Sequence, residues 1–438
     1  MTDDSLKPHS DSTASSAADA SGAPARIAAA PRWVVRLVAV GLVLAALNLR
    51  PAISGLGPLL EEVRDSLGMS GATAGLLTSV PALCFAVFGS LAPRLARRRG
   101  PAPVVLAGMV AITAGLALRP FAGGTAAFLA ASALALAGIA VGNVLMPVVV
   151  KRWFPARIGS MTGLYSMGLA LGTACAAAVT VPMTEALGGS WRVGLGTWAL
   201  FAVLAIVPWA VVLKDRGSRR PEPAAAEEAA SRSDPGTGAV AVQSARIRIG
   251  TSPTAWALGG FFGLQASAAY IIMGWLPQIF RDAGVSASTA GLLLAVTMGM
   301  GVPLSFVLPR MATRMRHQGP LVLALCGCGL TGYAGLWFAP AAGALVWALL
   351  LGIANCAFPL ALTMISLRSR SSAGVVKLSA FAQSTGYLIS IPGPLLVGAL
   401  HDAVGGWHAP LLLMTVLLLG QTVMGVLAGR DRVIEDGR

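Results

Sequence analysis

Apolar residues along this chain occur in long, nearly unbroken stretches rather than in alternation with polar ones. Twelve such runs recur, each close to 20 residues and therefore long enough to cross a bilayer as a helix. The short alternating segments of a membrane β-barrel are absent from the sequence. We therefore predict an all-α membrane protein with twelve transmembrane helices. The predicted helices cover about residues 34–60, 72–92, 102–119, 125–150, 159–182, 191–213, 254–280, 287–308, 319–338, 342–366, 376–400 and 409–428.

Two polar segments lie outside these runs. The first, rich in Ser, Ala and Asp, predicts a disordered tail. The second contains several Pro and Glu residues and predicts a low-complexity linker. The predicted organisation is a tail at 1–32, a six-helix half at 33–213, a linker at 214–252, a second six-helix half at 253–428 and a short tail at 429–438.

Composition agrees with a membrane protein. Hydrophobic residues make up 55% of the chain and charged residues only 11%, too few to cover the surface of a soluble protein of this length. The net charge of +14 raises the question of nucleic acid, but the basic residues follow the topology instead. They gather at the termini and in the linker and even-numbered connections, whereas the odd connections hold only Arg64, Arg119, Arg192 and Arg281.

This asymmetry predicts the orientation of the chain. Positive connections stay in the cytoplasm, so we expect both termini and the linker to be cytoplasmic and the protein to lie in the cell (inner) membrane. The basic charge then contacts anionic lipid, and no nucleic-acid partner is expected. The five cysteines and four histidines have no metal or redox spacing, so we expect neither a metal nor a cofactor.

The two predicted halves resemble each other at a nearly fixed offset. Thr73-Ala74-Gly75-Leu76-Leu77 recurs 216 positions later, and so does the pattern Pro93-Arg94-x-Ala96-x-Arg98. Gly188-Gly189-x-Trp191 is echoed by Gly405-Gly406-Trp407, and Asn143-x-x-x-Pro147 by Asn355-x-x-x-Pro359. Matches in order at one offset indicate a duplicated six-helix unit. Two such units form the architecture of alternating-access carriers.

The segment from Gly89 to Arg99 resembles the signature loop of the major facilitator superfamily, with Pro93 where the signature has an acid and Ala96 where it has a glycine. Leu47-Asn48-Leu49-Arg50-Pro51 and Ala382-Gln383-Ser384-x-Gly386-Tyr387 resemble the cyanate and nitroimidazole transporter branch. The resemblance implies a membrane carrier for a small solute. We further expect a monomer that is not an enzyme, and protons or a counter-anion are the candidate coupling partners. The residues assigned to gating or to the signature loop are Gly89, Pro93, Arg94, Arg98, Pro309, Arg310 and Arg314.

Arg50 is the most informative single residue. It lies about 14 residues into the first predicted helix, roughly 20 Å along its axis, and is the only ionisable side chain we place well inside a span. Burying a guanidinium near the bilayer centre costs at least ~2.5–3.5 kcal/mol, and arginine cannot lose its proton to avoid this cost. Two hypotheses stay open: an anion site that the substrate completes, and a structural arginine satisfied by backbone carbonyls.

The surroundings of Arg50 favour the anion site. Pro51 and Pro58 each remove a helical hydrogen bond, and a broken membrane helix is typical of a cavity wall. At helical spacing Ser54, Gly57 and Glu61 follow on the same face, and Glu61 is the one plausible carboxylate for proton coupling.

Other polar side chains inside the spans are candidates for substrate contact. Gln383 and Tyr387 share one face of the eleventh helix with Ser379, which predicts an interior stripe. Asn143 and Asn355 each precede a proline by four residues, so their own carbonyls are free. Substrate contact and helix packing stay open as roles for both groups. The predicted substrate-binding set is Arg50, Asn48, Ser54, Asn143, Tyr165, Gln265, Tyr270, Asn355, Gln383, Ser384 and Tyr387.

These features predict a secondary transporter for a small anion or a nitro- or carboxyl-bearing compound. The alternative within transport is an efflux carrier for neutral amphipathic compounds, although aromatic residues make up only 6% of the chain. A membrane enzyme would need a catalytic constellation and a sensor would need a signalling domain, and the sequence suggests neither.

Overall fold

The computed structural model describes residues 31–214 and 249–436. The predicted tail at 1–32 and linker at 214–252 lie almost wholly outside the described residues. Within those ranges, twelve helical spans are long and apolar enough to cross a membrane, as predicted. The elements of the first half are α1 (Arg32–Asn48), α2 (Pro51–Ser54), η1 (Gly57–Leu59), α3 (Leu60–Leu67), α4 (Gly71–Arg99), α5 (Pro101–Leu118), η2 (Arg119–Phe121), α6 (Thr125–Trp153), η3 (Pro155–Arg157), α7 (Ile158–Ala186) and α8 (Trp191–Lys214). Those of the second half are η5 (Ile249–Thr251), α11 (Pro253–Asp282), α12 (Ala287–Gly299), α13 (Gly301–Arg314), α14 (Gly319–Phe338), α15 (Ala344–Asn355), α16 (Ala357–Leu367), α17 (Ser372–Ser390), α18 (Pro392–Val404), α19 (His408–Ala428) and η6 (Ile434–Asp436).

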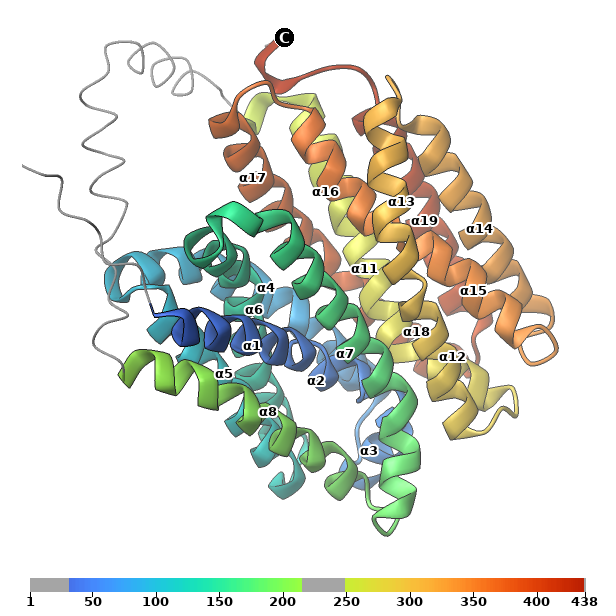
Figure 1. The fold of residues 1–438 in the computed structure, drawn as a ribbon. Coiled ribbons are helices and arrows are strands. Elements are labelled where there is room, and N and C mark those ends of the chain that lie inside the picture. The colour runs from blue at the N-terminus through green and yellow to red at the C-terminus, as the bar shows by residue number, and fades with distance from the viewer. Residues whose placement is uncertain (1–30, 215–248, 437–438) are drawn as a thin grey trace, which may run out of the picture.

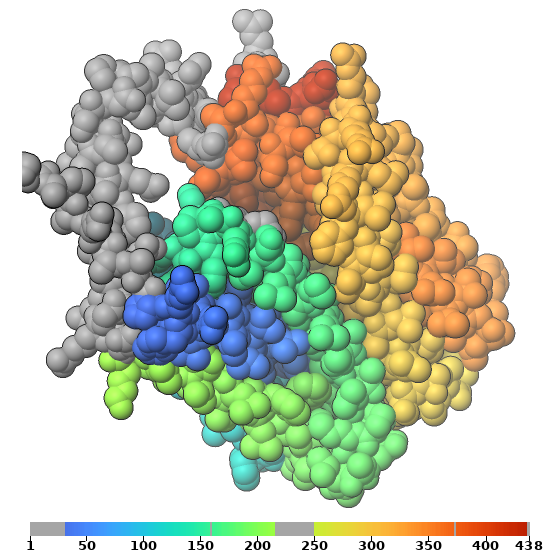
Figure 2. All heavy atoms as spheres, in the orientation of Figure 1, coloured from blue at the N-terminus to red at the C-terminus, as the bar shows by residue number. Residues whose placement is uncertain are grey.

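The two halves form separate bundles that meet along one seam (Figure 1). Figure 2 shows them as a blue-to-green mass and a yellow-to-red mass, with green α7 against yellow α12. Three spans of the second half are divided near their middle, because the ladder of helical hydrogen bonds is interrupted close to Met300, Cys356 and Ile391.

The internal repeat is visible at the level of single hydrogen bonds. Ser70 caps α4 by accepting from the N–H of Thr73, and Ser286 caps α12 by accepting from the N–H of Thr289. Each serine thereby satisfies an N–H group that has no partner within its helix. Gly68 and Gly284, which precede these caps, both have a positive φ, of 60° and 90°. The duplicated sequence therefore makes duplicated turns.

The segment that resembles the signature loop is helical, which corrects the expectation of a connection there. Gly89, Pro93, Arg94 and Arg98 all lie within α4, and Pro309, Arg310 and Arg314 lie within α13. Arg94 donates to the carbonyl of Ser90 at 3.3 Å, and Arg310 donates to the carbonyl of Phe306 at 3.1 Å. The two bonds are again equivalent in the repeat, and each long side chain satisfies a carbonyl one turn earlier in its own helix.

The first span is broken where its sequence predicts. Helix α1 ends at Asn48, and the chain restarts at Pro51 as the one-turn helix α2. The span then continues through η1 and α3 to Leu67, further than the predicted end near residue 60. Because the span is interrupted, the helical spacing that placed Glu61 on the face of Arg50 does not hold, and that prediction was wrong.

The seam between the halves is tightest near the odd-numbered connections; we call this part the odd-side seam. Helices α12 and α18, which adjoin those connections, pack on α7 and α4, whereas α13 touches α7 only lightly. Glycines allow backbone to meet backbone there: a Cβ at Gly57 would collide with the carbonyl of Met273, one at Gly398 with the carbonyl of Gly71, and one at Gly291 with the carbonyl of Ala177 at 2.6 Å.

Charged side chains join the halves at the same end. Arg281 of α11 lies 2.8 Å from Glu61 and 2.9 Å from Glu62 of α3, and it donates to the carbonyl of Pro58 at 3.0 Å. We call this group the Arg281 latch. Beside it, Arg64 of the first half pairs with Asp402 of the second at 3.3 Å.

The chain after the last span folds back onto the second half. The N–H of Ile434 donates to the carbonyl of Arg368, and Glu435 accepts from the N–H groups of Arg370 and Ser371 and from the hydroxyl of Ser369. Burial alone would raise the pKa of Glu435, but these hydrogen bonds outweigh it and lower that pKa. An ionised Glu435 therefore holds the C-terminal segment against the start of α17.

Candidate substrate site

Arg50 stands at the break in the first span, as the residue that precedes α2. Its own carbonyl accepts from the N–H groups of Ile53 and Ser54 and from the Ser54 hydroxyl at 3.1 Å. These hydrogen bonds fix the backbone turn that follows Arg50. The side chain is half-buried and interacts electrostatically with Tyr165, Tyr270 and Tyr387. The Tyr270 hydroxyl lies within reach of the Arg50 guanidinium.

Three of the four tyrosines of the chain therefore interact with one guanidinium. Tyr165 comes from α7 in the first half, whereas Tyr270 and Tyr387 come from α11 and α17 in the second. The Tyr165 hydroxyl donates to Oδ1 of Asn143 at 3.2 Å, which orients it. The cluster thus spans the seam, where a carrier of two halves can expose a solute to either side.

Arg50 has no acidic partner in the part of the chain that the structure describes. Acidic residues there lie at helix ends, and no ion pair involves Arg50. A guanidinium at this depth costs at least ~2.5–3.5 kcal/mol, which a bound anion would offset. Phenolic hydroxyls can donate to the same anion, so the arrangement suits a small negatively charged or strongly polarised group.

Aromatic rings line one flank of this cluster. Tyr387 stacks on Phe85 of α4 with ring centroids 5.0 Å apart and meets Phe262 of α11 edge-on at 5.2 Å. Phe262 also contacts Phe358 of α16, with centroids 5.6 Å apart. A flat ring can therefore pack beside the anion-binding groups. Although aromatics are few in the whole chain, Phe85 of the first half and Tyr387 of the second stack across the seam.

A second polar cluster lies inside the C-terminal half. Gln265 donates to both the carbonyl and the side-chain oxygen of Asn355, each at 2.9 Å, and accepts from Gln421 at 2.9 Å. The Asn355 carbonyl is the one that Pro359 leaves without a helical partner. Gln265 therefore supplies the hydrogen bond that the Asn355 carbonyl lacks at the break between α15 and α16. None of these bonds joins the cluster to Arg50.

The other predicted site residues are distributed differently. Asn48 is buried and donates to the carbonyls of Leu44 and Phe201, which holds α1 against α8. Gln383 donates to Ser379 at 2.7 Å along α17, on the same helix as Tyr387, and both side chains are half-buried. Ser384 is exposed. The structure thus brings Arg50, Asn143 and the three tyrosines together, and leaves Asn48, Gln265 and Asn355 in separate contacts.

Sequence reasoning missed two buried charges, Arg119 and Arg368. Arg119 was predicted to lie in a connection, yet only 1% of it is exposed, and it sits at the end of the third span. It follows α5 directly and points into the first half. The adjacent Pro120 made it look like part of a connection. Phe85, Phe262 and Gln421 were also missed, because in sequence they are ordinary members of helical runs.

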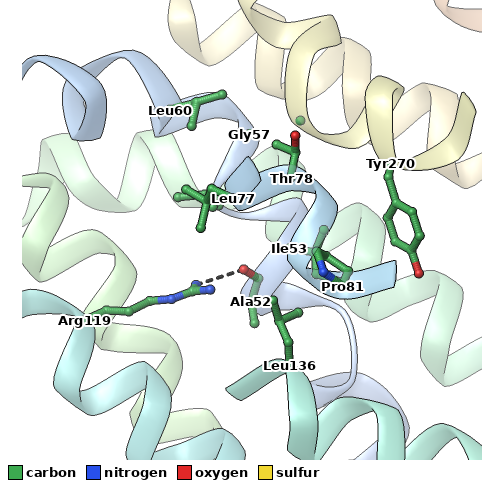
Figure 3. A pocket seen from close by; sticks show the side chains of 12 residues that line it. Ala52, Ile53, Gly57, Leu60, Leu77, Thr78, Pro81, Arg119, Leu136 and Tyr270 are labelled. Carbon is green, nitrogen blue, oxygen red and sulfur yellow. Dashed lines mark hydrogen bonds between the residues drawn. The ribbon is translucent and has the colours of Figure 1, made fainter. Parts of the chain in front are cut away.

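A small cavity of about 20 Å³ lies beside the broken span, between Arg119 and Tyr270 (Figure 3). Ala52, Ile53 and Gly57 of the first span form its wall, as expected for a broken helix that borders a cavity. Figure 3 shows Arg119 reaching the Ala52 carbonyl from one side, with Tyr270 on the other side of the same turn.

Two bundles of six helices with a polar cluster at their seam define a membrane transporter of the alternating-access class. The family model described as Major Facilitator Superfamily matches residues 38–390, and the chain belongs to that superfamily. It is therefore a multi-pass membrane protein and a secondary transporter of a small solute.

Three curated relatives extend over most of the chain. It is 34% identical to the uncharacterized transporter YycB of Bacillus subtilis over 92% of this chain and 94% of that one. It is 33% identical to the 2-nitroimidazole transporter of Escherichia coli over 90% and 95% of the two chains. It is 32% identical to the cyanate transport protein CynX of Escherichia coli over 84% and 90%. The resemblance to the cyanate and nitroimidazole branch is confirmed.

Solved structures agree on the fold alone. The D-xylose–proton symporter has a TM-score of 0.68 at 13% identity, covering 92% of this chain and 99% of that one. The inward-open xylose transporter XylE of Escherichia coli has a TM-score of 0.69 at 12% identity, covering 89% and 95%.

Proposed function

We propose that this protein carries a small anion, or a small ring that bears a nitro or carboxyl group, across the cell membrane. The observation that carries the proposal is the Arg50 guanidinium, which has no acidic partner among the described residues and interacts with three tyrosines at the seam. The names of two relatives, a 2-nitroimidazole transporter and a cyanate transport protein, support the same substrate class. Cyanate is a small linear anion, and a nitro group presents two partly negative oxygens to a guanidinium fork.

The route is alternating access with both termini and the linker in the cytoplasm. The charge asymmetry of the connections supports this orientation. The halves are then joined at the extracellular end by the odd-side seam and the Arg281 latch. In this state the site communicates with the cytoplasm, and release of the odd-side seam exposes it to the outside.

Energy coupling follows from the absence of an acid beside the site. Within the described residues, Arg50 has no carboxylate partner that could carry a proton through the membrane. Glu61 pairs with Arg281 at the odd face instead. The substrate is therefore exchanged for another anion, runs down its own gradient, or brings its own proton.

The test is binding to purified protein, measured by ligand-induced thermal shift. Potassium cyanate and 2-nitroimidazole are the probes, and imidazole is the matched ligand without the nitro group. We expect both probes to raise the melting temperature and imidazole to have no effect. In Arg50→Gln we expect at least about tenfold weaker binding, and in Arg50→Lys an intermediate loss, because an ammonium keeps the charge without the bidentate fork.

Arg192→Gln is the matched control, since Arg192 is a half-buried arginine that bonds Pro120 and Ser66 within the first half, away from the site. Unchanged probe affinity in Arg50→Gln would reject the anion site and leave Arg50 as a structural residue.

The second candidate is efflux of neutral amphipathic compounds, which the aromatic cluster around Phe262 favours. Equal stabilisation by imidazole and 2-nitroimidazole, with Arg50→Gln indifferent to both, would support it. Transport into proteoliposomes then separates either carrier from a binding protein that does not transport.

A further inference from the structure

Arg119 is a buried charge that the proposed anion site does not yet explain. It lies in η2, at the end of the third span, and is 1% exposed. Its Nε donates to the hydroxyl of Ser132 at 2.9 Å, its guanidinium lies 5.6 Å from the Phe128 ring centre, and within the described residues no carboxylate pairs with it. An apolar residue would satisfy the packing there at much less cost in desolvation.

The third contact of Arg119 is the informative one. Its Nη1 donates to the carbonyl of Ala52 at 2.8 Å, deep in the bundle (Figure 3). In a continuous helix that carbonyl would accept from the N–H of Leu56. Here the Leu56 N–H bonds to Ile53 instead, because the helix ends after one turn. Arg119 therefore caps a carbonyl that the break in the first span leaves without a backbone partner.

Ala52 lies two residues after Arg50 within the same turn. At its start, the turn is closed by Ser54, whose N–H and hydroxyl both bond to the Arg50 carbonyl. Among the hydrogen bonds of α2 in the described chain, only the one from Arg119 to the Ala52 carbonyl joins α2 to a neighbouring span. A small cavity borders α2 at Ala52 and Ile53, so this side of the turn is not fully packed.

We propose that Arg119 is a positioning residue of the transport site: it holds α2 in the orientation that presents the Arg50 side chain to Tyr165, Tyr270 and Tyr387. The proposal rests on the proposed function for the meaning of the site, but not for the effect on α2. A charge-assisted bond is suited to this role, because it is stronger than a neutral one and arginine stays protonated at every working pH. Arg119 itself does not touch the solute.

The matched control is a buried arginine of the second half that also caps backbone carbonyls. Arg368 is 2% exposed and caps the carbonyls of Ala428 and Gly429 at 2.8 and 3.0 Å, far from Arg50 in the fold. The variants are Arg119→Gln, Arg119→Lys and Arg368→Gln in the full chain. Three quantities are measured on each: melting temperature, affinity for cyanate and 2-nitroimidazole, and amide hydrogen exchange over residues 49–56.

We expect Arg119→Gln to bind the probes at least about tenfold more weakly and to exchange faster over residues 49–56. Arg119→Lys should recover part of both effects, since it restores a charged donor. Arg368→Gln should lower the melting temperature to a similar extent without changing either site measurement.

Wild-type exchange rates over 49–56 in Arg119→Gln would overturn the proposal, and so would wild-type affinity in that variant. If the wild type binds neither probe, the proposed substrate class fails, and the exchange comparison between the Arg119 and Arg368 variants still decides whether Arg119 positions α2.

Discussion

Replacing Arg281 by glutamine should loosen the odd-side seam. One guanidinium there meets two carboxylates at 2.8 and 2.9 Å and donates to the Pro58 carbonyl at 3.0 Å. At water's dielectric constant an ion pair at 2.8 Å is worth about 1.5 kcal/mol, but exposed pairs measure only about 0.2–1 kcal/mol. The Glu61 and Glu62 side chains are 40% and 36% exposed, so we take the lower half of that range for each pair.

The hydrogen bond to Pro58 adds about 1 kcal/mol after the same discount for solvent. Together the latch contributes about 2 kcal/mol to the closed seam, which corresponds to a shift of up to about 30-fold in the open-to-closed ratio. Arg64 and Asp402 remain to hold the seam, so the variant should open more often without falling apart.

The assay is the accessibility of a single cysteine beneath the latch. Thr78 of α4 is 7% exposed and packs against Gly274 of the other half, so Thr78→Cys reports opening of the seam. The five native cysteines are first replaced, and a membrane-impermeant maleimide is added from the side of the odd connections. We expect Arg281→Gln to raise the labelling rate by about 5- to 30-fold and Arg192→Gln to leave it unchanged. An unaltered rate in Arg281→Gln would refute the latch as a holding element.

Three further predictions follow from single contacts. Tyr387→Phe and Gln383→Leu should reduce transport with little loss of membrane insertion. The phenylalanine keeps the ring contacts and loses only the hydroxyl near the site. Normal transport in both variants would mean that Gln383 and Tyr387 serve helix packing alone. Because the pKa of Glu435 is lowered in the folded protein, its contribution should be complete above about pH 4.3 and vanish as the pH falls through its lower folded pKa. A spin label at Val433 should therefore become mobile in acid, and in Glu435→Gln its mobility should no longer depend on pH in that range. A reporter fused at Ser233 should be active only in a cytoplasmic format, and activity only outside would reverse the proposed orientation.

The spans and the repeat were predictable because a bilayer imposes them on local sequence. A run of about 20 apolar residues has essentially one way to satisfy its backbone in lipid. The break after Asn48 was predictable for the same reason, since Pro51 removes a specific hydrogen bond. Arg50 was conspicuous because it is a charge inside such a run.

The convergence of tyrosines on Arg50 was not predictable from local pattern. Tyr165, Tyr270 and Tyr387 lie on three helices that are distant in sequence, and only the packing of two halves brings them together. Arg119 shows the opposite difficulty. It stands beside Pro120 at the end of an apolar run, so its local sequence is typical of a connection. Its buried position depends on the carbonyl of Ala52, 67 residues earlier, which is free to accept only because the helix is broken there.

The glycine contacts of the odd-side seam bear on how quickly the halves can part. Where Gly57 faces Met273 and Gly398 faces Gly71, backbone lies directly against backbone, and few long side chains must be reordered when the contact forms or breaks. Such a surface loses little rotamer entropy on closing, so it fits closely without adding a large kinetic barrier. Strength then comes mainly from the half-exposed charges around Arg281, whose attraction is screened by salt. The ionic strength on that side of the membrane should therefore have a larger effect on the turnover rate than the repacking of side chains at the seam has.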